Sequence, residues 1–152
     1  MWERLRRFSA LEGQARGMLV RAMLLLPVVS QSLKWRGFAA TQESLQRRRQ
    51  PARKSGDSGK QNLDVTVRMV KAAVRHSFGH PSCLEESLTL WWLLARQGIS
   101  SEVRIGVRKE AEKFEAHAWV ERDGVALNEP EGKHQHYAAF EAEFSKINRE
   151  SQ

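Results

Sequence analysis

The sequence predicts an α+β fold, with helices first along the chain and a small antiparallel sheet after them. Two patterns indicate this order. As far as Ala95, apolar residues recur mostly every three or four positions, which is helical spacing, whereas from Val103 to Asn128 they alternate with polar residues, as strands do. The 152 residues suit a single domain, and the 41% hydrophobic and 28% charged content is that of a globular protein. Composition therefore indicates the class of fold and names no function.

Residues 1–46 are predicted to form a helical N-terminal part. Apolar positions from Trp2 to Met23 lie on one helical face, and a second helix is expected between Pro27 and Leu45. These two helices make up the helical N-terminal part.

The apolar run Met18–Val29 is interpreted as part of a core helix. It contains Arg21 and Pro27 and is shorter than the roughly 20 residues that span a bilayer, so no membrane span is expected. No small-residue cleavage site follows it, which argues against a signal peptide. The chain has one cysteine and cannot form an internal disulfide. The cytoplasm is therefore the expected compartment.

Residues 47–61 are predicted to be a flexible basic linker, rich in Arg, Lys, Gly, Ser and Pro, with Ala52 as their apolar residue. Residues 1–60 hold thirteen basic and four acidic residues, so the net charge of +7 comes from this N-terminal part of the chain. Such a surface can attract nucleic acid, anionic lipid or an acidic peptide or protein, and charge alone does not choose between them.

Residues 62–152 are predicted to be the catalytic core, which begins with two helices. Leu63 to Val74 has helical spacing, with Asp64 near the expected start. Ser82 and Glu85 then form a capping-box pattern, which places Cys83 at the first position of the next helix. Leu84, Leu88, Trp91 and Ala95 would form its buried stripe, and Gly98 would end it as the C′ residue.

The sheet is predicted from strands around Val103–Val107 and Ala116–Glu121. Asp123-Gly124 is a hairpin turn pattern that leads into a third strand, Val125–Asn128. A short helix over Tyr137–Ile147 is expected to cover the sheet.

Three residues suggest nucleophilic chemistry. A thiol reacts as thiolate, and the amide dipoles at a helix start favour that form of Cys83. His117, on a strand, is the candidate base, and Glu129, just after the hairpin, is the candidate group that orients the histidine. The Cys83 backbone N–H would donate to the oxyanion formed on attack. Each residue alone has an ordinary structural explanation, so only the three together point to catalysis.

The chain also resembles the lasso-peptide maturation peptidases, between about Val65 and Tyr137. The resemblance lies in the order and spacing of several runs: Cys83-Leu84-Glu85-Glu86-Ser87-Leu88, Leu93-Leu94-Ala95-Arg96-Gln97-Gly98-Ile99, Ile105-Gly106-Val107-Arg108-Lys109, Phe114-Glu115-Ala116-His117-Ala118-Trp119-Val120-Glu121 and Leu127-Asn128-Glu129.

This resemblance implies a transglutaminase-like (papain-like) fold whose catalytic helix packs on a small antiparallel sheet. It also implies a cysteine peptidase that removes the leader from a ribosomally made precursor before macrolactam cyclisation. Cys83 matches the family's nucleophile and His117 its base, whereas Glu129 stands where Asp is common.

The resemblance further implies three partners: the precursor peptide with its leader, a separate leader-recognition protein and an asparagine-synthetase-like cyclase. No winged-helix recognition domain is apparent in this sequence, and no phosphate loop either. Any ATP dependence would come through a partner, and we expect no cofactor in this chain.

Four other interpretations remain open. A transglutaminase or amidase would use the same acyl-thioenzyme. Cys83, His117, His134 and His136 could form a zinc site. The chain could be a non-catalytic scaffold that binds the leader or the cyclase. Nucleic-acid binding is a further reading, but the tryptophans Trp2, Trp35, Trp91 and Trp92 fit helix stripes and are expected in the core, so no nucleic-acid partner is expected.

Overall fold

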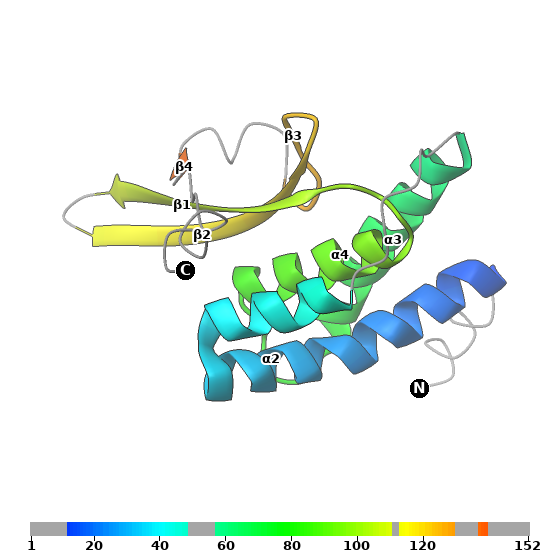
Figure 1. The fold of residues 1–152 in the computed structure, drawn as a ribbon, viewed down its shortest axis with the longest axis horizontal. Coiled ribbons are helices and arrows are strands. Elements are labelled where there is room, and N and C mark those ends of the chain that lie inside the picture. Colours follow the sequence, from blue (N-terminus) through cyan, green and yellow to red (C-terminus); the bar gives the residue numbers. More distant parts are fainter. Residues whose placement is uncertain (1–11, 49–56, 111–112, 130–136, 140–152) are drawn as a thin grey trace, which may run out of the picture.

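The protein consists of a helical layer and an antiparallel sheet, seen in a computed structural model that describes residues 12–48, 57–110, 113–129 and 137–139. Helices α2 (Gly13–Arg47), α3 (Asp57–His76) and α4 (Cys83–Arg96) precede strands β1 (Glu102–Glu110), β2 (Lys113–Arg122), β3 (Val125–Ala126) and β4 (Ala138–Ala139). In Figure 1 the sheet lies above α4, and α2 lies on the other side of that helix. This arrangement confirms the predicted α+β class.

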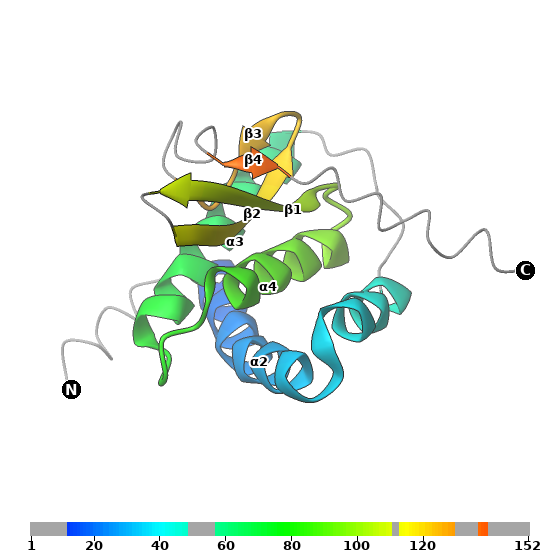
Figure 2. The ribbon, with the colours of Figure 1, turned by 90° about the vertical axis from the view of Figure 1, so that its left-hand side faces the viewer.

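The core forms where α4 is enclosed by the other elements, as Figure 2 shows. Leu88, Leu90 and Leu94 of α4 are fully buried, and Val70 of α3 and Val120 of β2 join the same apolar cluster. The α4 segment therefore links the two layers, and its position fixes where its first residue lies.

Both predicted ends of α4 are confirmed. The helix begins at Cys83 with Ser82 as its N-cap, and both halves of the capping box are present. At the other end Gly98 has φ +74°, and the N–H groups of Gly98 and Ile99 donate to the carbonyls of Ala95 and Leu94. These two bonds make a Schellman motif, which only a residue tolerant of positive φ can close.

The long helix α2 departs from the predicted break at Pro27. The helix continues through Pro27 and changes direction at Gly37, where φ is +75° and ψ is 179°. Thr41 bonds the Gly37 carbonyl and Ser32 across this bend. A proline can stay within a helix at the loss of one hydrogen bond. The backbone conformation at Gly37, by contrast, is not helical and suits glycine alone, so the bend lies there. The predicted segment Trp2–Leu11 lies outside the described residues.

The predicted linker 47–61 is shorter than expected, because α3 already begins at Asp57. Asp64 consequently lies inside the helix and not at its start. By length and hydropathy α2 would suffice to cross a membrane, a test that core helices and signal sequences also pass. Ala22, Leu26 and Val29 are buried, but only 28% of the most apolar stretch of α2 is, so the core-helix interpretation holds for one face of the helix.

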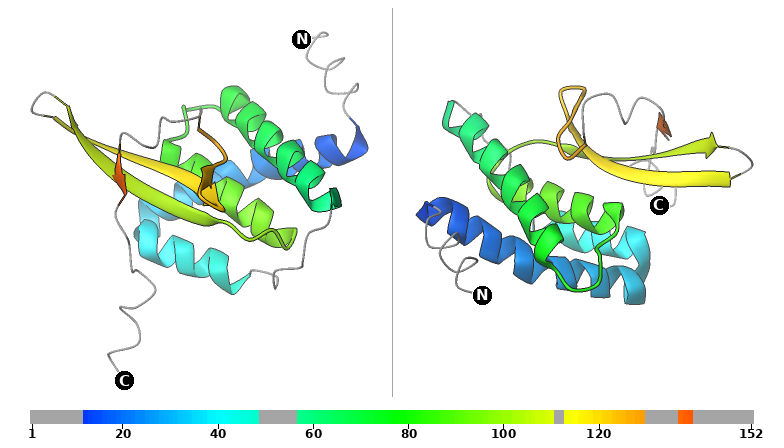
Figure 3. Two further views of the ribbon diagram at one scale, coloured as in Figure 1. Left: turned by 90° about the horizontal axis from the view of Figure 1, so that it is seen from above. Right: turned by 180° about the vertical axis from the view of Figure 1, so that it is seen from behind.

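The sheet has the strand order β3-β2-β1-β4 and is built on the hairpin of β1 and β2. In this register Gly106 lies opposite His117 on one side and Ala139 on the other. Figure 3 shows the hairpin extending past the helices where β1 ends and β2 begins. His117 therefore lies near the middle of β2, with Gly106 of the central strand β1 beside it.

Two predicted elements near the sheet differ from the structure. The third strand ends at Ala126, two residues short of the expected Asn128. The predicted helix from Tyr137 is wrong in the described residues, because Ala138 and Ala139 pair with β1 as strand β4. A two-residue strand is made by a partner distant in sequence, so no local pattern indicates it.

Candidate active site

Cys83 stands at the start of a well-capped helix. The Glu85 N–H donates to Ser82 Oγ over 3.3 Å, and the Ser82 N–H donates to Glu85 Oε2 over 2.5 Å. These bonds fix the first turn, so the amide dipoles of α4 are aligned behind a half-buried thiol. Glu85 is itself partly buried, which raises its pKa, but hydrogen bonds from Ser30 and Ser82 outweigh burial and lower it.

His117 and Glu129 come together, as predicted from the hairpin. His117 Nε2 lies 2.7 Å from Glu129 Oε1, and the two side chains are only 12% and 10% exposed. The distance is that of an ion pair, although the N–H direction departs from a straight hydrogen bond. The tight turn at Asp123 and Gly124, where φ is +52° and +77°, returns the chain alongside β2 and so makes the approach possible.

Asn128 anchors Glu129 and ties the sheet to α4. Its Oδ1 accepts from the Val120 N–H at 2.8 Å, and its Nδ2 donates to Ser87 Oγ at 3.2 Å. All three groups are buried, where a satisfied polar network is rigid. The residue next to Glu129 thus bridges the two layers. No local pattern in the sequence marked this role for Asn128.

Glu86 shows that the first turn of α4 lies beside the histidine pair. Burial raises the pKa of Glu86, while a hydrogen bond from Asn128 and the charges of Lys71 and His117 lower it; the charge of Glu129 raises it further. Since Cys83 and Glu86 are three residues apart, they occupy neighbouring positions on one helix face. Cys83 therefore begins the helix turn that borders this cluster.

The described contacts contain no hydrogen bond between Cys83 and the His117 ring. Catalytic hydrogen bonds are often long in unliganded enzymes and shorten when substrate binds. The structure thus joins His117 to Glu129, while the pairing of Cys83 with His117, and the catalytic roles of all three, stay predictions.

An aromatic cluster surrounds the histidine. The Tyr137 ring centroid lies 5.1 Å from that of His117, and the Trp119 ring stacks at 6.3 Å. Tyr137 is buried beneath Arg108, whose guanidinium lies 5.0 Å from the ring centre. A Cβ on Gly106 would come within 2.9 Å of Tyr137, so this glycine makes room for the cluster. Sequence reasoning missed Tyr137 because it assigned that residue to a helix.

No group of three or more potential metal-binding side chains occurs among the residues that the structure describes. The zinc interpretation required His134 and His136 as well as Cys83 and His117, and these two histidines lie outside the described ranges. The structure thus leaves that hypothesis untested.

A capped cysteine helix packed on an antiparallel sheet that carries a histidine and its carboxylate defines the papain-like and transglutaminase-like class of folds. The comparison with protein families agrees. The model of the transglutaminase-like superfamily matches residues 23–142, and the chain belongs to this superfamily. Its fold is typical of cysteine peptidases and acyltransferases. No curated protein and no solved structure matches the chain significantly.

Proposed function

We propose that the protein is a cysteine peptidase that removes the leader from a lasso-peptide precursor before the macrolactam ring is closed. The observation that carries the proposal is the His117–Glu129 pair, 2.7 Å apart, beside the first turn of the helix that begins at Cys83. Membership of the transglutaminase-like superfamily supports acyl transfer through cysteine, and the resemblance in the ordered sequence runs favours leader removal.

In the proposed reaction the Cys83 thiolate attacks the carbonyl carbon of the scissile peptide bond. The Cys83 backbone N–H, at the open start of α4, donates to the oxyanion. Because Glu129 occupies Nε2, the Nδ1 atom of His117 is the nitrogen left to exchange a proton with the thiol. As the C–N bond breaks, that proton passes to the leaving amine, and the leader stays attached as a thioester.

Water then attacks the thioester carbonyl, and His117 takes its proton. The C–S bond breaks, the proton returns to sulfur, and the leader leaves with a carboxylate. Glu129 keeps the imidazole oriented and stabilises its charged form during both steps. An amine in place of water would give transamidation, which is the alternative activity for the same site.

The proposal includes three partners: the precursor, a separate leader-recognition protein and an asparagine-synthetase-like cyclase that receives the freed core peptide. We place the reaction in the cytoplasm, with no membrane span or nucleic-acid partner, and with any ATP use confined to a partner. The tryptophans were expected in the core, which argued against a nucleic-acid partner. For Trp35 this expectation is wrong, because its side chain is 81% exposed.

The test is mass spectrometry of the precursor after incubation with the protein and the leader-recognition protein. Wild type should cut between leader and core, and Cys83→Ala should lose more than a thousandfold of the rate, the scale at which removing a nucleophile acts. Ser100→Ala, an exposed residue outside the site, is the matched control. Processing by Cys83→Ala at the wild-type rate would leave the scaffold interpretation.

A second measurement separates hydrolysis from transamidation. In water labelled with heavy oxygen, hydrolysis places one labelled atom in the new leader carboxylate. A product that carries an added amine and no labelled carboxylate would assign the chain to the transglutaminase alternative.

A further inference from the structure

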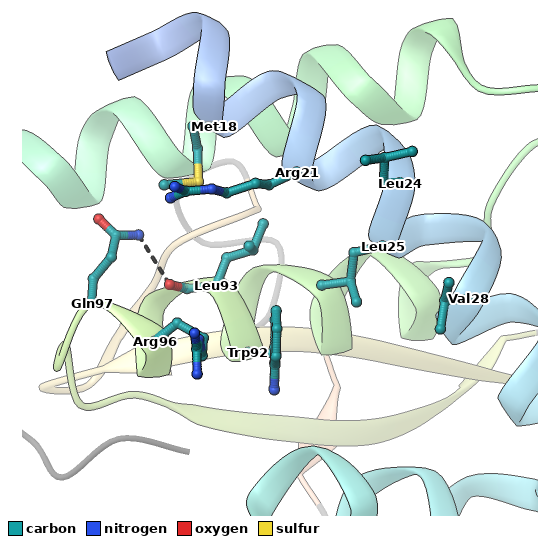
Figure 4. Close-up of a pocket in the computed structure, with 9 residues that line it drawn as sticks. All are labelled: Met18, Arg21, Leu24, Leu25, Val28, Trp92, Leu93, Arg96 and Gln97. Carbon is teal, nitrogen blue, oxygen red and sulfur yellow. Dashed lines mark hydrogen bonds between the residues drawn. The ribbon is translucent and has the colours of Figure 1, made fainter. Parts of the chain in front are cut away.

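A groove between α2 and α4 lies outside the candidate active site. It has a volume of about 500 Å³, and its floor and walls are mainly apolar, from Leu24, Leu25 and Val28 of α2 and Trp92 of α4. Figure 4 shows Leu25 reaching from α2 toward α4, with Arg21 on α2 and Arg96 beside Trp92 on α4. The concave shape and the apolar lining are those of a surface that receives side chains of a ligand.

On the α2 side of the groove, large apolar side chains are exposed to solvent. Leu24 is 67% exposed and Val28 is 62% exposed, although Leu26 and Val29 on the opposite side of the helix are buried. Val20 and Met23 add to the same exposed stretch, with 43% and 44%. A continuous apolar face on a folded surface marks an interaction site more often than chance exposure does.

Two arginines give the groove its polarity. The Arg96 guanidinium lies over the Trp92 ring, 5.5 Å from its centre, and Arg21 reaches in from α2. Both side chains are exposed, and neither makes an ion pair with a carboxylate of the described residues. A ligand that places acidic groups at these positions would complement the surface.

We propose that the α2–α4 groove docks an amphipathic segment of another protein, with apolar side chains on one face and Asp or Glu beside them. Apolar anchors would enter between Leu24, Val28 and Trp92, as in helix-in-groove recognition. The carboxylates would meet Arg21 and Arg96. This surface is separate from Cys83, so the proposal holds whichever bond the thiol attacks.

Two other occupants fit the groove less well. A second copy of the chain would bring Arg21 and Arg96 against the same charges of its partner, in a protein of net charge +7. A lipid surface would use the most exposed aromatic of α2, Trp35, at least as much as the recessed Trp92, yet Trp35 does not line the groove.

The test uses two labelled 15-residue peptides with the same leucines at positions i, i+4 and i+7, one with glutamates between them and the other with lysines. Fluorescence anisotropy with the full chain should show the glutamate peptide binding at least about tenfold more tightly, because charge pairs choose the partner at such rims. The double variant Arg21→Glu/Arg96→Glu should reverse the preference. Arg36→Glu, exposed on α2 but outside the groove, should change it less than about twofold.

Leu24→Glu should weaken binding of the glutamate peptide about tenfold or more, while Trp35→Glu should leave it unchanged. Cys83→Ala should bind as wild type does, which separates this proposal from the peptidase proposal. Equal affinity for both peptides, or none for either, would overturn it. Binding to phosphatidylglycerol vesicles that Leu24→Glu and Trp35→Glu weaken alike, or a dimer that Leu24→Glu dissolves, would also overturn it.

Discussion

Glu129 has one methylene more than an aspartate would have, and this extra length does not prevent its contact with His117. Its Oε1 atom reaches His117 Nε2 at 2.7 Å because Asn128, one residue earlier, is bonded to both β2 and α4. The anchor holds the backbone at the distance that the longer side chain needs. The position of the main chain at residue 129 therefore decides whether a glutamate or an aspartate can reach His117.

Replacement of Glu129 tests the orienting role. Glu129→Gln keeps the shape and removes the charge, so the rate of precursor cleavage should fall by about a hundredfold or more, since the imidazolium loses its counter-charge. Glu102→Gln, an exposed glutamate on β1, is the control and should cut at nearly the wild-type rate. An unchanged rate in Glu129→Gln would assign the orienting role elsewhere.

The sequence sufficed to predict the contact between His117 and Glu129, because a two-residue turn dictates which positions become neighbours. It did not suffice for Asn128 or Tyr137. Asn128 acts through Ser87 on another element, and Tyr137 reaches His117 only because β4 pairs with β1. Both depend on tertiary contacts that leave no mark on local periodicity.

At the scale of elements, helix α4 was predicted at both ends because its signals are local: a capping box at Ser82 and a glycine with positive φ at Gly98. The α2 helix was harder to predict. Proline is a strong sequence signal, yet the bend lies at Gly37, where Thr41 and Ser32 stabilise a turn that the sequence does not announce.

Replacement of Gly106 tests how closely β4 packs on β1. An added Cβ would meet Tyr137 at 2.9 Å and the Ala138 backbone oxygen at 3.1 Å, so Gly106→Ala must displace β4. We expect a loss of about 1–3 kcal/mol in the free energy of unfolding, as overpacking gives, together with slower cleavage, because Tyr137 moves away from His117.

The matched control is Gly17→Ala on α2, where nothing lies within 4 Å of the added Cβ. In an exposed helix position this change should stabilise by about 0.5–1 kcal/mol. Thermal unfolding of the two variants measures both effects. If Gly106→Ala were as stable and active as wild type, the close packing of β4 on β1 would be refuted.

At the scale of the whole molecule, the layers meet at Glu86, and this carboxyl makes stability depend on pH. Burial, with the charge of Glu129, leaves its pKa above the ordinary 4.5 despite Asn128, Lys71 and His117. The folded state therefore holds this proton more tightly than the unfolded state does. The resulting stabilisation is present below pH 4.5 and is lost as pH rises through the raised value.

Glu86→Gln removes this titration. Relative to wild type, the variant should gain thermal stability between pH 4 and pH 7, and Glu43→Gln, an exposed glutamate on α2, should show no such trend. Differential scanning calorimetry at the two pH values gives the comparison. A stability difference that does not vary with pH would contradict the raised pKa of the half-buried Glu86.

The order of layers was predictable from the change of period along the chain, from helical to alternating. The exposed apolar face of α2 was not, since the same leucine and valine spacing predicts a core helix whether or not a neighbour covers each side. Burial of one face and exposure of the other depend on how many elements pack around α2, which is a property of the assembled molecule.

The open side of strand β2 has a consequence for how molecules of this protein meet one another. Strand β3 pairs with β2 only at Glu121 and Arg122, so within the described residues no strand pairs with that edge from Lys113 to Ala118. Unpaired edges invite sheets of neighbouring molecules to join. Here Lys113 and Glu115 place charges along the edge, and β3 and β4, two residues each, offer little to pair with. Within the described residues the sheet thus has an unpaired stretch of edge whose charges disfavour its joining to a second copy of the chain.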